Sequence, residues 1–243
     1  MKFKIFETYE EASAYSAELL AEVIRTKRDA VLGLATGSSP EGMYKEIIRR
    51  YEAGEIDFSQ VKSINLDEYV GLTGDHDQSY RYFMDTHLFN HVNINKANTH
   101  VPQGVGQDLA ALAKAYDELI ENLGGIDVQV LGIGANGHIG FNEPEHELHL
   151  KTHVAELKPE TIEANARFFE SRDDVPTKAV TMGIGAILSA KKIILIASGE
   201  SKAEAVKALE DDFISTHVPA TLLKLHADVT VVLDKEAASL LTK

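Results

Sequence analysis

Cysteine is absent from this chain of 243 residues. Disulfides, thiolate nucleophiles and zinc or iron–sulfur sites built on cysteine are therefore excluded. The chain also lacks an apolar run long enough to cross a bilayer, and polar residues follow its first apolar residues, 1–6, at once. These absences predict a cytoplasmic protein with no signal peptide and no membrane partner.

Basic residues are scarce, with 24 Lys and Arg against 38 Asp and Glu, which gives a net charge of −14. Such a surface repels nucleic acid, so no nucleic-acid partner is expected. It also repels a phosphorylated substrate, so a site for a phosphate ester must supply its own positive potential. The remaining composition, 44% hydrophobic and 26% charged, predicts a folded globular chain.

Short runs rich in Val, Ile and Leu alternate with amphipathic segments. We expect strands at residues 2–6, 30–34, 61–66, 128–133, 178–182, 191–198 and 229–233, and helices at 9–24, 40–51, 108–123 and 201–209. This alternation predicts an α/β fold, with an open, mostly parallel sheet and helices on both faces in a Rossmann-like three-layer arrangement. Without a repeat or linker, residues 1–243 read as a single domain. The polar stretch at 145–172 lacks this alternation of strands and helices. It is either a surface excursion or a lid over a site.

The junction after the second expected strand carries an anion-site pattern. Pro40 is expected at the first helical position, with Ser39 as its N-cap. Gly37 permits a tight turn, and the hydroxyls of Thr36, Ser38 and Ser39 lie beside free N–H groups of a helix start. The segment is neither a Walker motif nor a dinucleotide fingerprint. An ordinary capped helix is the alternative.

Two adjacent acids, Asp67 and Glu68, directly follow the third expected strand. Because ligands bind beyond the carboxyl ends of strands in open α/β sheets, this position faces a cleft. Side chains alternate along an extended chain, so one acid should point into the cleft and the other elsewhere. A carboxylate there can act as a base on a carbon acid. The alternative is an Asp that caps the next turn and a Glu in solvent.

A glycine-rich loop at residues 132–144 overlaps the end of the strand expected at 128–133. Its glycines imply a backbone that turns sharply or approaches a ligand closely. The loop contains His138, a side-chain type suited to proton transfer near neutral pH, and Asn136 or Glu143 could orient it. A structural loop with a solvent-facing histidine is the alternative.

Other residues of the chain give weaker signals. The histidines at 146, 149 and 153 do not have zincin spacing, and we predict a polar surface segment there and no metal. No Gly-x-Ser-x-Gly elbow supports a serine nucleophile. Arg167 and Lys202 are either surface charges or contacts to a phosphate.

Four segments, taken in order, resemble the glucosamine-6-phosphate deaminase family, also called the isomerase family. They are residues 32–40, 65–72, 132–144 and 165–169. The second and third are specific as a pair, whereas the first is shared with 6-phosphogluconolactonases. The resemblance implies amino-sugar catabolism, in which glucosamine 6-phosphate and water become fructose 6-phosphate and ammonia without a metal or organic cofactor.

The resemblance also implies catalytic roles. His138, supported by Glu143 and Asn136, would shuttle protons during opening of the pyranose ring. Asp67 would take the C2 proton and deliver it to C1, and the resulting 2-imine would hydrolyse. Long family members carry Asp where this chain has Asn136. The amide keeps hydrogen bonding but lacks the charge, so Glu143 would carry more of the supporting role.

Phosphate binding and regulation are implied in the same way. Residues 36–39, Arg167 and Lys202 would hold the phosphate and supply the positive potential that the net charge demands. Long members form hexamers that N-acetylglucosamine 6-phosphate activates through basic residues. His153 and Ala155 stand at the corresponding positions here. We therefore expect a short form that is not activated, as a monomer or small homo-oligomer.

Two other functions remain open from sequence. A 6-phosphogluconolactonase-like hydrolase would share the fold but needs no base at C2, so the segment around Asp67 argues against it. A non-catalytic sugar-phosphate sensor would usually accompany a DNA-binding helix-turn-helix, for which this acidic chain has no room. The preference between glucosamine and galactosamine 6-phosphate is not determined.

Overall fold

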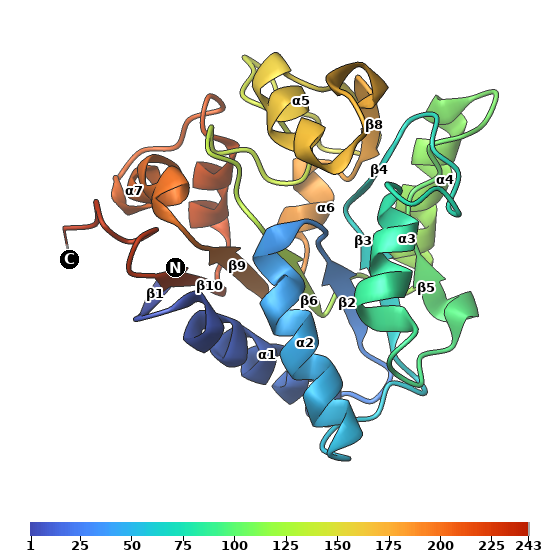
Figure 1. Ribbon diagram of the computed structural model, residues 1–243, viewed down its shortest axis with the longest axis horizontal. Helices are drawn as coiled ribbons and strands as arrows, with labels where there is room; N and C mark the ends of the chain where they lie inside the picture. The colour runs from blue at the N-terminus through green and yellow to red at the C-terminus, as the bar shows by residue number, and fades with distance from the viewer. Residues whose placement is uncertain (243) are drawn as a thin grey trace.

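The main sheet has seven strands, and every pair of neighbours in it is parallel (Figure 1). The computed structural model describes residues 1–242, without the side chain of Phe168. In spatial order the strands are β1 (Lys2–Phe6), β10 (Val229–Asp234), β9 (Ile193–Ala197), β6 (Val128–Leu131), β2 (Val31–Leu34), β3 (Lys62–Asn65) and β5 (Thr99–His100). The predicted α/β fold with a mostly parallel sheet is confirmed.

A second, antiparallel sheet lies beside the first, with the order β4 (Asp67–Tyr69), β8 (Lys178–Thr181), β7 (His153–Glu156). The strand predicted at 178–182 is present, but it belongs to this small sheet. The sequence did not show this, because a short apolar run carries no information about its partner strand. Only Leu66 separates β3 from β4. The chain therefore leaves the main sheet and enters the small one at Asp67.

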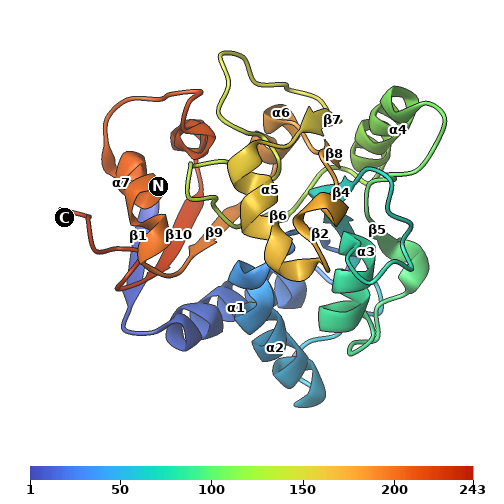
Figure 2. The same ribbon diagram turned by 45° about the horizontal axis from the view of Figure 1, so that its top comes forward.

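Helices cover the main sheet from two sides. α1 (Tyr9–Thr26) and α2 (Ser38–Glu52) pack together on one side, and α4 (Leu109–Asn122) and α6 (Ile184–Leu188) lie on the other (Figure 2). The remaining helices are α3 (Tyr80–Met84), α5 (Pro159–Asn165) and α7 (Ala203–Glu210). Within residues 1–242, none of these helices combines the length and apolar character needed to cross a membrane.

The start of α2 differs from the prediction. Gly37 is its N-cap, with φ of 85°, and Ser38 is already helical. Ser39 was therefore wrongly predicted as the N-cap. The left-handed turn that glycine permits brings the chain into the helix earlier than the proline suggested.

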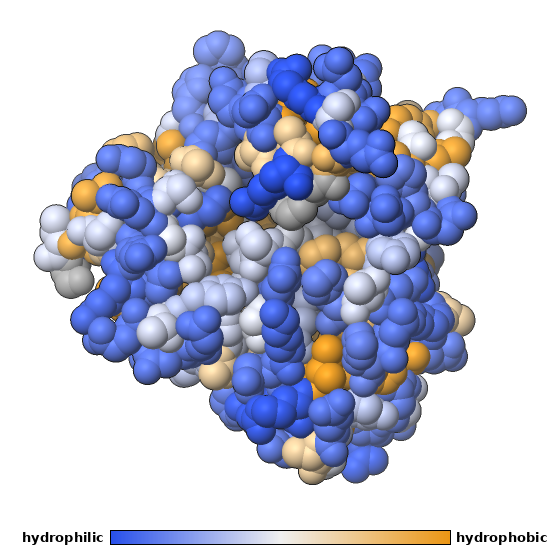
Figure 3. Space-filling model, viewed as in Figure 1, coloured by the Kyte–Doolittle hydropathy of each residue, from blue (hydrophilic) through white to orange (hydrophobic). Residues whose placement is uncertain are grey.

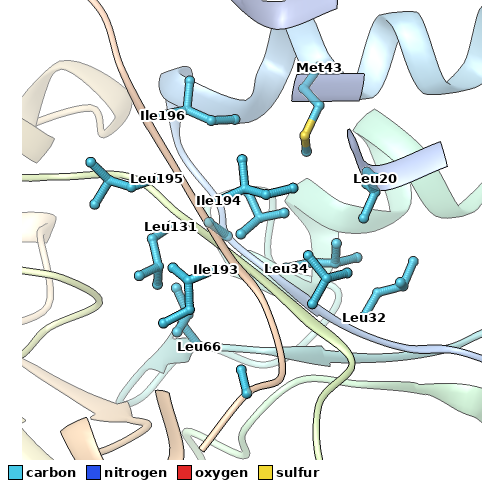
Figure 4. Close-up of a cluster of buried hydrophobic side chains, with 14 of the residues drawn as sticks. Leu20, Leu32, Leu34, Met43, Leu66, Leu131, Ile193, Ile194, Leu195 and Ile196 are labelled. Atoms are coloured by element: carbon cyan, nitrogen blue, oxygen red, sulfur yellow. The ribbon is translucent and has the colours of Figure 1, made fainter. Parts of the chain in front are cut away.

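The core explains where polar residues can gather. Every residue of β2, β6, β9 and β10 is buried, as expected for parallel strands covered on both faces. Figure 4 shows the side chains of this cluster, among them Leu32, Leu131 and Ile194, packed against Met43 of α2 and Leu20 of α1. With both faces apolar, the carboxyl ends of the strands are left for polar chemistry.

The polar stretch at 145–172 contains β7, α5 and a short 3-10 helix, Ala166–Phe168. β7 is only partly buried at the edge of the small sheet, and α5 has seven residues. Such short, half-exposed elements produce little hydrophobic periodicity, which is why the sequence showed no rhythm here.

Candidate active site

The strand order reverses between β6 and β2. The crossover from β2 to β3 runs through α2, and the crossover from β6 to β9 runs through α6 on the opposite side. Ligands of open α/β folds bind at the carboxyl side of such a switch point. A cavity of about 830 Å³ lies there, lined by residues that follow β2, β3, β6 and β9. Figure 3 shows the hollow near the centre of this face.

Asp67, the first residue of β4, lies against the glycine-rich loop and is only 6% exposed. A Cβ added at Gly140, whose φ is 56°, would meet Asp67 Oδ2 at 3.3 Å and Thr181 Oγ1 at 3.2 Å. Only glycine lets the loop close on the acid in this way. Burial raises the pKa of Asp67 to about 8, and the charge of Glu68 acts in the same direction, against the backbone N–H of Phe141. Asp67 is thus a carboxyl whose proton exchanges near neutral pH.

Glu68 points away from this cavity and lines a separate one of about 540 Å³. The prediction that the two acids face opposite ways is confirmed, and the alternative of Glu68 in solvent is wrong, because the side chain is buried. Its oxygens accept three backbone N–H groups, from Tyr69, Tyr80 and Arg81.

His138 is oriented by both of its predicted partners. Its Nδ1 lies 2.7 Å from Asn136 Oδ1 and 3.4 Å from Glu143 Oε2. Asn136 in turn donates its amide to Glu143 Oε2 at 2.8 Å, and Thr161 of α5 donates its hydroxyl to Glu143 Oε1. Burial raises the pKa of Glu143, but the interactions with His138, Thr161 and Asn136 outweigh it and leave the pKa below its usual value. A carboxylate therefore stands behind the imidazole.

The opposite end of the cavity is suited to an anion. The first N–H groups of α2 begin at Ser38, and the Tyr9 hydroxyl donates to Ser38 O and accepts from Gly42 N, which holds the loop. Lys202, at the start of α7, is half-buried, and burial followed by the charge of Arg167 lowers its pKa. A bound anion would offset both the burial of this ammonium group and its repulsion by Arg167.

Every predicted site residue except Glu143 lines this one cavity, and Glu143 joins it through Asn136. Sequence reasoning missed Tyr80, Thr161, Ser198 and Ser201, which also line it. Ser201 had a detectable signal, because it precedes Lys202 at a strand-to-helix junction. Tyr80 and Thr161 reach the cavity only through the tertiary fold.

The histidines of the 146–153 segment form contacts among rings. The rings of His149 and His153 lie 4.2 Å apart, and His146 meets His217 edge-on at 5.3 Å. Among residues 1–242, no three His, Asp or Glu side chains are arranged to hold a metal ion.

Known proteins with this sequence pattern form a defined group. The family model described as glucosamine-6-phosphate isomerases/6-phosphogluconolactonase matches residues 6–232. A glucosamine-6-phosphate deaminase of Clostridium perfringens (strain 13 / Type A) is 59% identical over 241 residues, covering 99% of this chain and all of the relative. One of Thermoanaerobacter pseudethanolicus is 56% identical, covering 99% of this chain and 95% of the relative.

Solved structures agree with the sequence relatives. A monomeric glucosamine-6-phosphate deaminase, described as a missing link of the NagB superfamily, is 48% identical with a TM-score of 0.96, covering 99% of this chain and 100% of its own. The 6-phosphogluconolactonase of Trypanosoma cruzi has a TM-score of 0.78 at 21% identity, covering 100% of this chain and 97% of its own, which shows a shared fold alone. The chain therefore belongs to the glucosamine-6-phosphate isomerase/6-phosphogluconolactonase family.

Proposed function

We propose that this chain converts glucosamine 6-phosphate and water into fructose 6-phosphate and ammonia, as a hydrolase of a C–N bond coupled to isomerisation. The observation that carries the proposal is the joint placement of Asp67, His138 and the anion-binding end in one cavity of about 830 Å³. The names of relatives that are more than half identical over nearly the whole chain support it.

The phosphate would bind at the start of α2, between residues 36–39 and the cations Lys202 and Arg167, which line the same cavity. Backbone N–H groups at a helix start favour a phosphate, and the two cations add charge-assisted hydrogen bonds. In a protein of net charge −14 this is where a phosphorylated ligand would find positive potential.

Ring opening would use His138. A pyranose opens when the C1 hydroxyl loses a proton and the ring oxygen gains one, so one group that accepts and donates a proton can serve both. The carboxylate of Glu143 and the amide of Asn136 hold the imidazole ring of His138 on its Nδ1 side. The opposite nitrogen, Nε2, would then exchange the proton.

Asp67 would act on the opened sugar. The C2–H bond lies next to the C1 carbonyl, so a carboxylate can remove that proton and return it to C1. As the C1 carbonyl oxygen gains a proton and the C2 nitrogen loses one, C1 becomes a CH2OH group and C2 becomes an imine. Water then adds to the imine, and ammonia leaves as C2 becomes the ketone. The substrate's ammonium group would lower the pKa of Asp67 and favour its basic form.

The segment from α5 to the short helix with Arg167 would act as a lid in this single-domain enzyme. α5 lines the cavity with Thr161 and Ala164, and the following residues Asn165 and Arg167 line it as well. Closing such a segment over a bound sugar phosphate excludes water and brings a cation to the phosphate.

The deciding experiment measures ammonia and fructose 6-phosphate released from glucosamine 6-phosphate, with galactosamine 6-phosphate as a parallel substrate. Equal amounts of both products from one amino sugar are expected. Hydrolysis of 6-phosphogluconolactone, with no ammonia released from either amino sugar, would instead support the lactonase alternative. Binding of the amino sugar without any turnover would support the sensor.

A further inference from the structure

A second buried carboxylate lies directly behind Asp67 on β4. Glu68 is 3% exposed and accepts the N–H groups of Tyr69 at 2.9 Å, Tyr80 at 2.9 Å and Arg81 at 3.0 Å. Tyr80 and Arg81 open helix α3, whose N-cap Ser79 accepts from Tyr82 N instead. The Glu68 side chain therefore ties β4 to the first turn of α3, where a negative charge is favoured.

This tie fixes one wall of the active-site cavity. The ring of Tyr80 lines the cavity and stacks on Phe141 of the glycine-rich loop, with centroids 6.0 Å apart and planes 10° apart. It also packs against Tyr69 at 4.8 Å. Because Glu68 holds the backbone of Tyr80, it positions a side chain that contacts the loop closing on Asp67.

The nearby cation Arg81 is engaged with other residues, so the charge of Glu68 still acts on Asp67. Arg81 lies close, but its guanidinium donates its hydrogen bonds to Asp85 and to Thr99. The other titratable groups facing the pair are His76 and His100 beside Glu68 and Arg81, and Tyr69, Tyr80 and Tyr116 around Asp67.

The hydrogen bonds indicate which acid ionises first. Three N–H donors hold the Glu68 carboxylate, whereas the Phe141 N–H acts on Asp67. Burial raises the pKa of Glu68, and its three donors lower it again in part. In a coupled pair the carboxyl with more hydrogen-bond donors takes the negative charge, and the other keeps its proton to higher pH.

We propose that Glu68 is a positioning residue of the reaction: it fixes Tyr80 and β4, and its charge keeps Asp67 a strong base. The inference rests on the proposed role of Asp67 as the base. No substrate contact is assigned to Glu68, which acts from a cavity on the far side of β4.

The test compares pH profiles of kcat/KM for ammonia release. Glu68→Gln keeps the size and removes the charge, so the rising limb should move to lower pH by about one unit or more, the size of effect that one nearby charge has on a carboxyl. The plateau rate should also fall, because a weaker base removes the C2 proton more slowly. Glu68→Asp keeps the charge and should leave the limb in place. Glu22→Gln, an exposed acid of α1, is the matched control for net charge.

A lower rate with an unmoved limb in Glu68→Gln would show a merely structural role and overturn the proposal, as would equal shifts in the Gln and Asp variants. If Glu68→Gln does not fold, carboxyl ¹³C NMR of the unaltered protein decides: Glu68 must deprotonate before Asp67, and the reverse order refutes the idea. A failure of the proposed role of Asp67 is detected separately, because the Asp67→Asn variant would then retain ammonia release.

Discussion

At the scale of single residues, Asp67 is the sharpest test of the chemistry. Asp67→Asn keeps the size and hydrogen-bonding shape of the side chain but cannot accept a proton. Turnover should fall by at least about 10²-fold, the low end for loss of a general base. Exchange of the C2 hydrogen with heavy water, followed by NMR, should stop with it. Deamination within tenfold of the parent rate would remove Asp67 from this role.

The burial of Asp67 also has a cost in stability that depends on pH. The folded protein holds the Asp67 proton up to about pH 8, whereas the unfolded chain releases it near the ordinary value of 3.8. Between those values unfolding releases a proton, so this residue lowers the free energy of unfolding as the pH rises. Asp67→Asn should match the parent near pH 4 and exceed it by on the order of a few kcal/mol above pH 8.

Urea unfolding at pH 5, 7 and 9 measures this difference. Asp212→Asn, a change at an exposed aspartate, serves as the control for the loss of one acidic side chain. A constant difference for Asp67→Asn would mean that Asp67 is ionised throughout in the folded protein.

The cationic end of the cavity predicts a binding defect. Lys202→Ala removes a half-buried ammonium beside the proposed phosphate site, and Arg167→Ala removes its neighbour. Each loss of a charge-assisted hydrogen bond should raise KM roughly 10- to 100-fold, with a smaller effect on kcat. Lys114→Ala, at an exposed lysine of α4, should leave KM unchanged. An unchanged KM in both cavity variants would place the phosphate elsewhere.

At the scale of elements, α5 is joined to the histidine network by one hydroxyl. Thr161 is buried and donates to Glu143, which supports His138. Thr161→Val keeps the branched shape and removes the donor, so kcat should fall about tenfold as Glu143 loses a charge-assisted hydrogen bond. Thr161→Ser retains the hydroxyl and should stay within a few-fold of the parent. Equal effects of Val and Ser would indicate a packing role instead.

At the scale of the whole molecule, the acidic surface bears on regulation. His153 and Ala155 line a third cavity of about 480 Å³, together with four glutamates, Glu143, Glu145, Glu147 and Glu156. No Lys or Arg is among the described residues that line this cavity, so it offers a phosphate no fixed positive charge. N-acetylglucosamine 6-phosphate should therefore leave the rate curve unchanged, and the curve should be hyperbolic without it. A sigmoidal curve that this compound makes hyperbolic would contradict the expectation.

The sequence by itself determined the main layers of the molecule. Parallel strands buried on both faces appear as continuous apolar runs, and the helices between them have a clear amphipathic period. The strand predicted at residues 2–6 is β1, and the long helices at 9–24 and 108–123 are found with shifted ends. The polar motifs after the strands could also be found in the sequence, because they interrupt the apolar runs.

Only the tertiary structure decided how the site is completed. Neither the small antiparallel sheet nor α3 and α5 shows a strong period, since their strands and helices have only three to seven residues each. Thr161 and Tyr80 enter the cavity through these elements, and Glu68 owes two of its three N–H donors to the position of α3. The high pKa of Asp67 likewise depends on burial, which no local pattern encodes. Contacts between residues distant in sequence require the folded chain, because local periodicity specifies elements and not their partners.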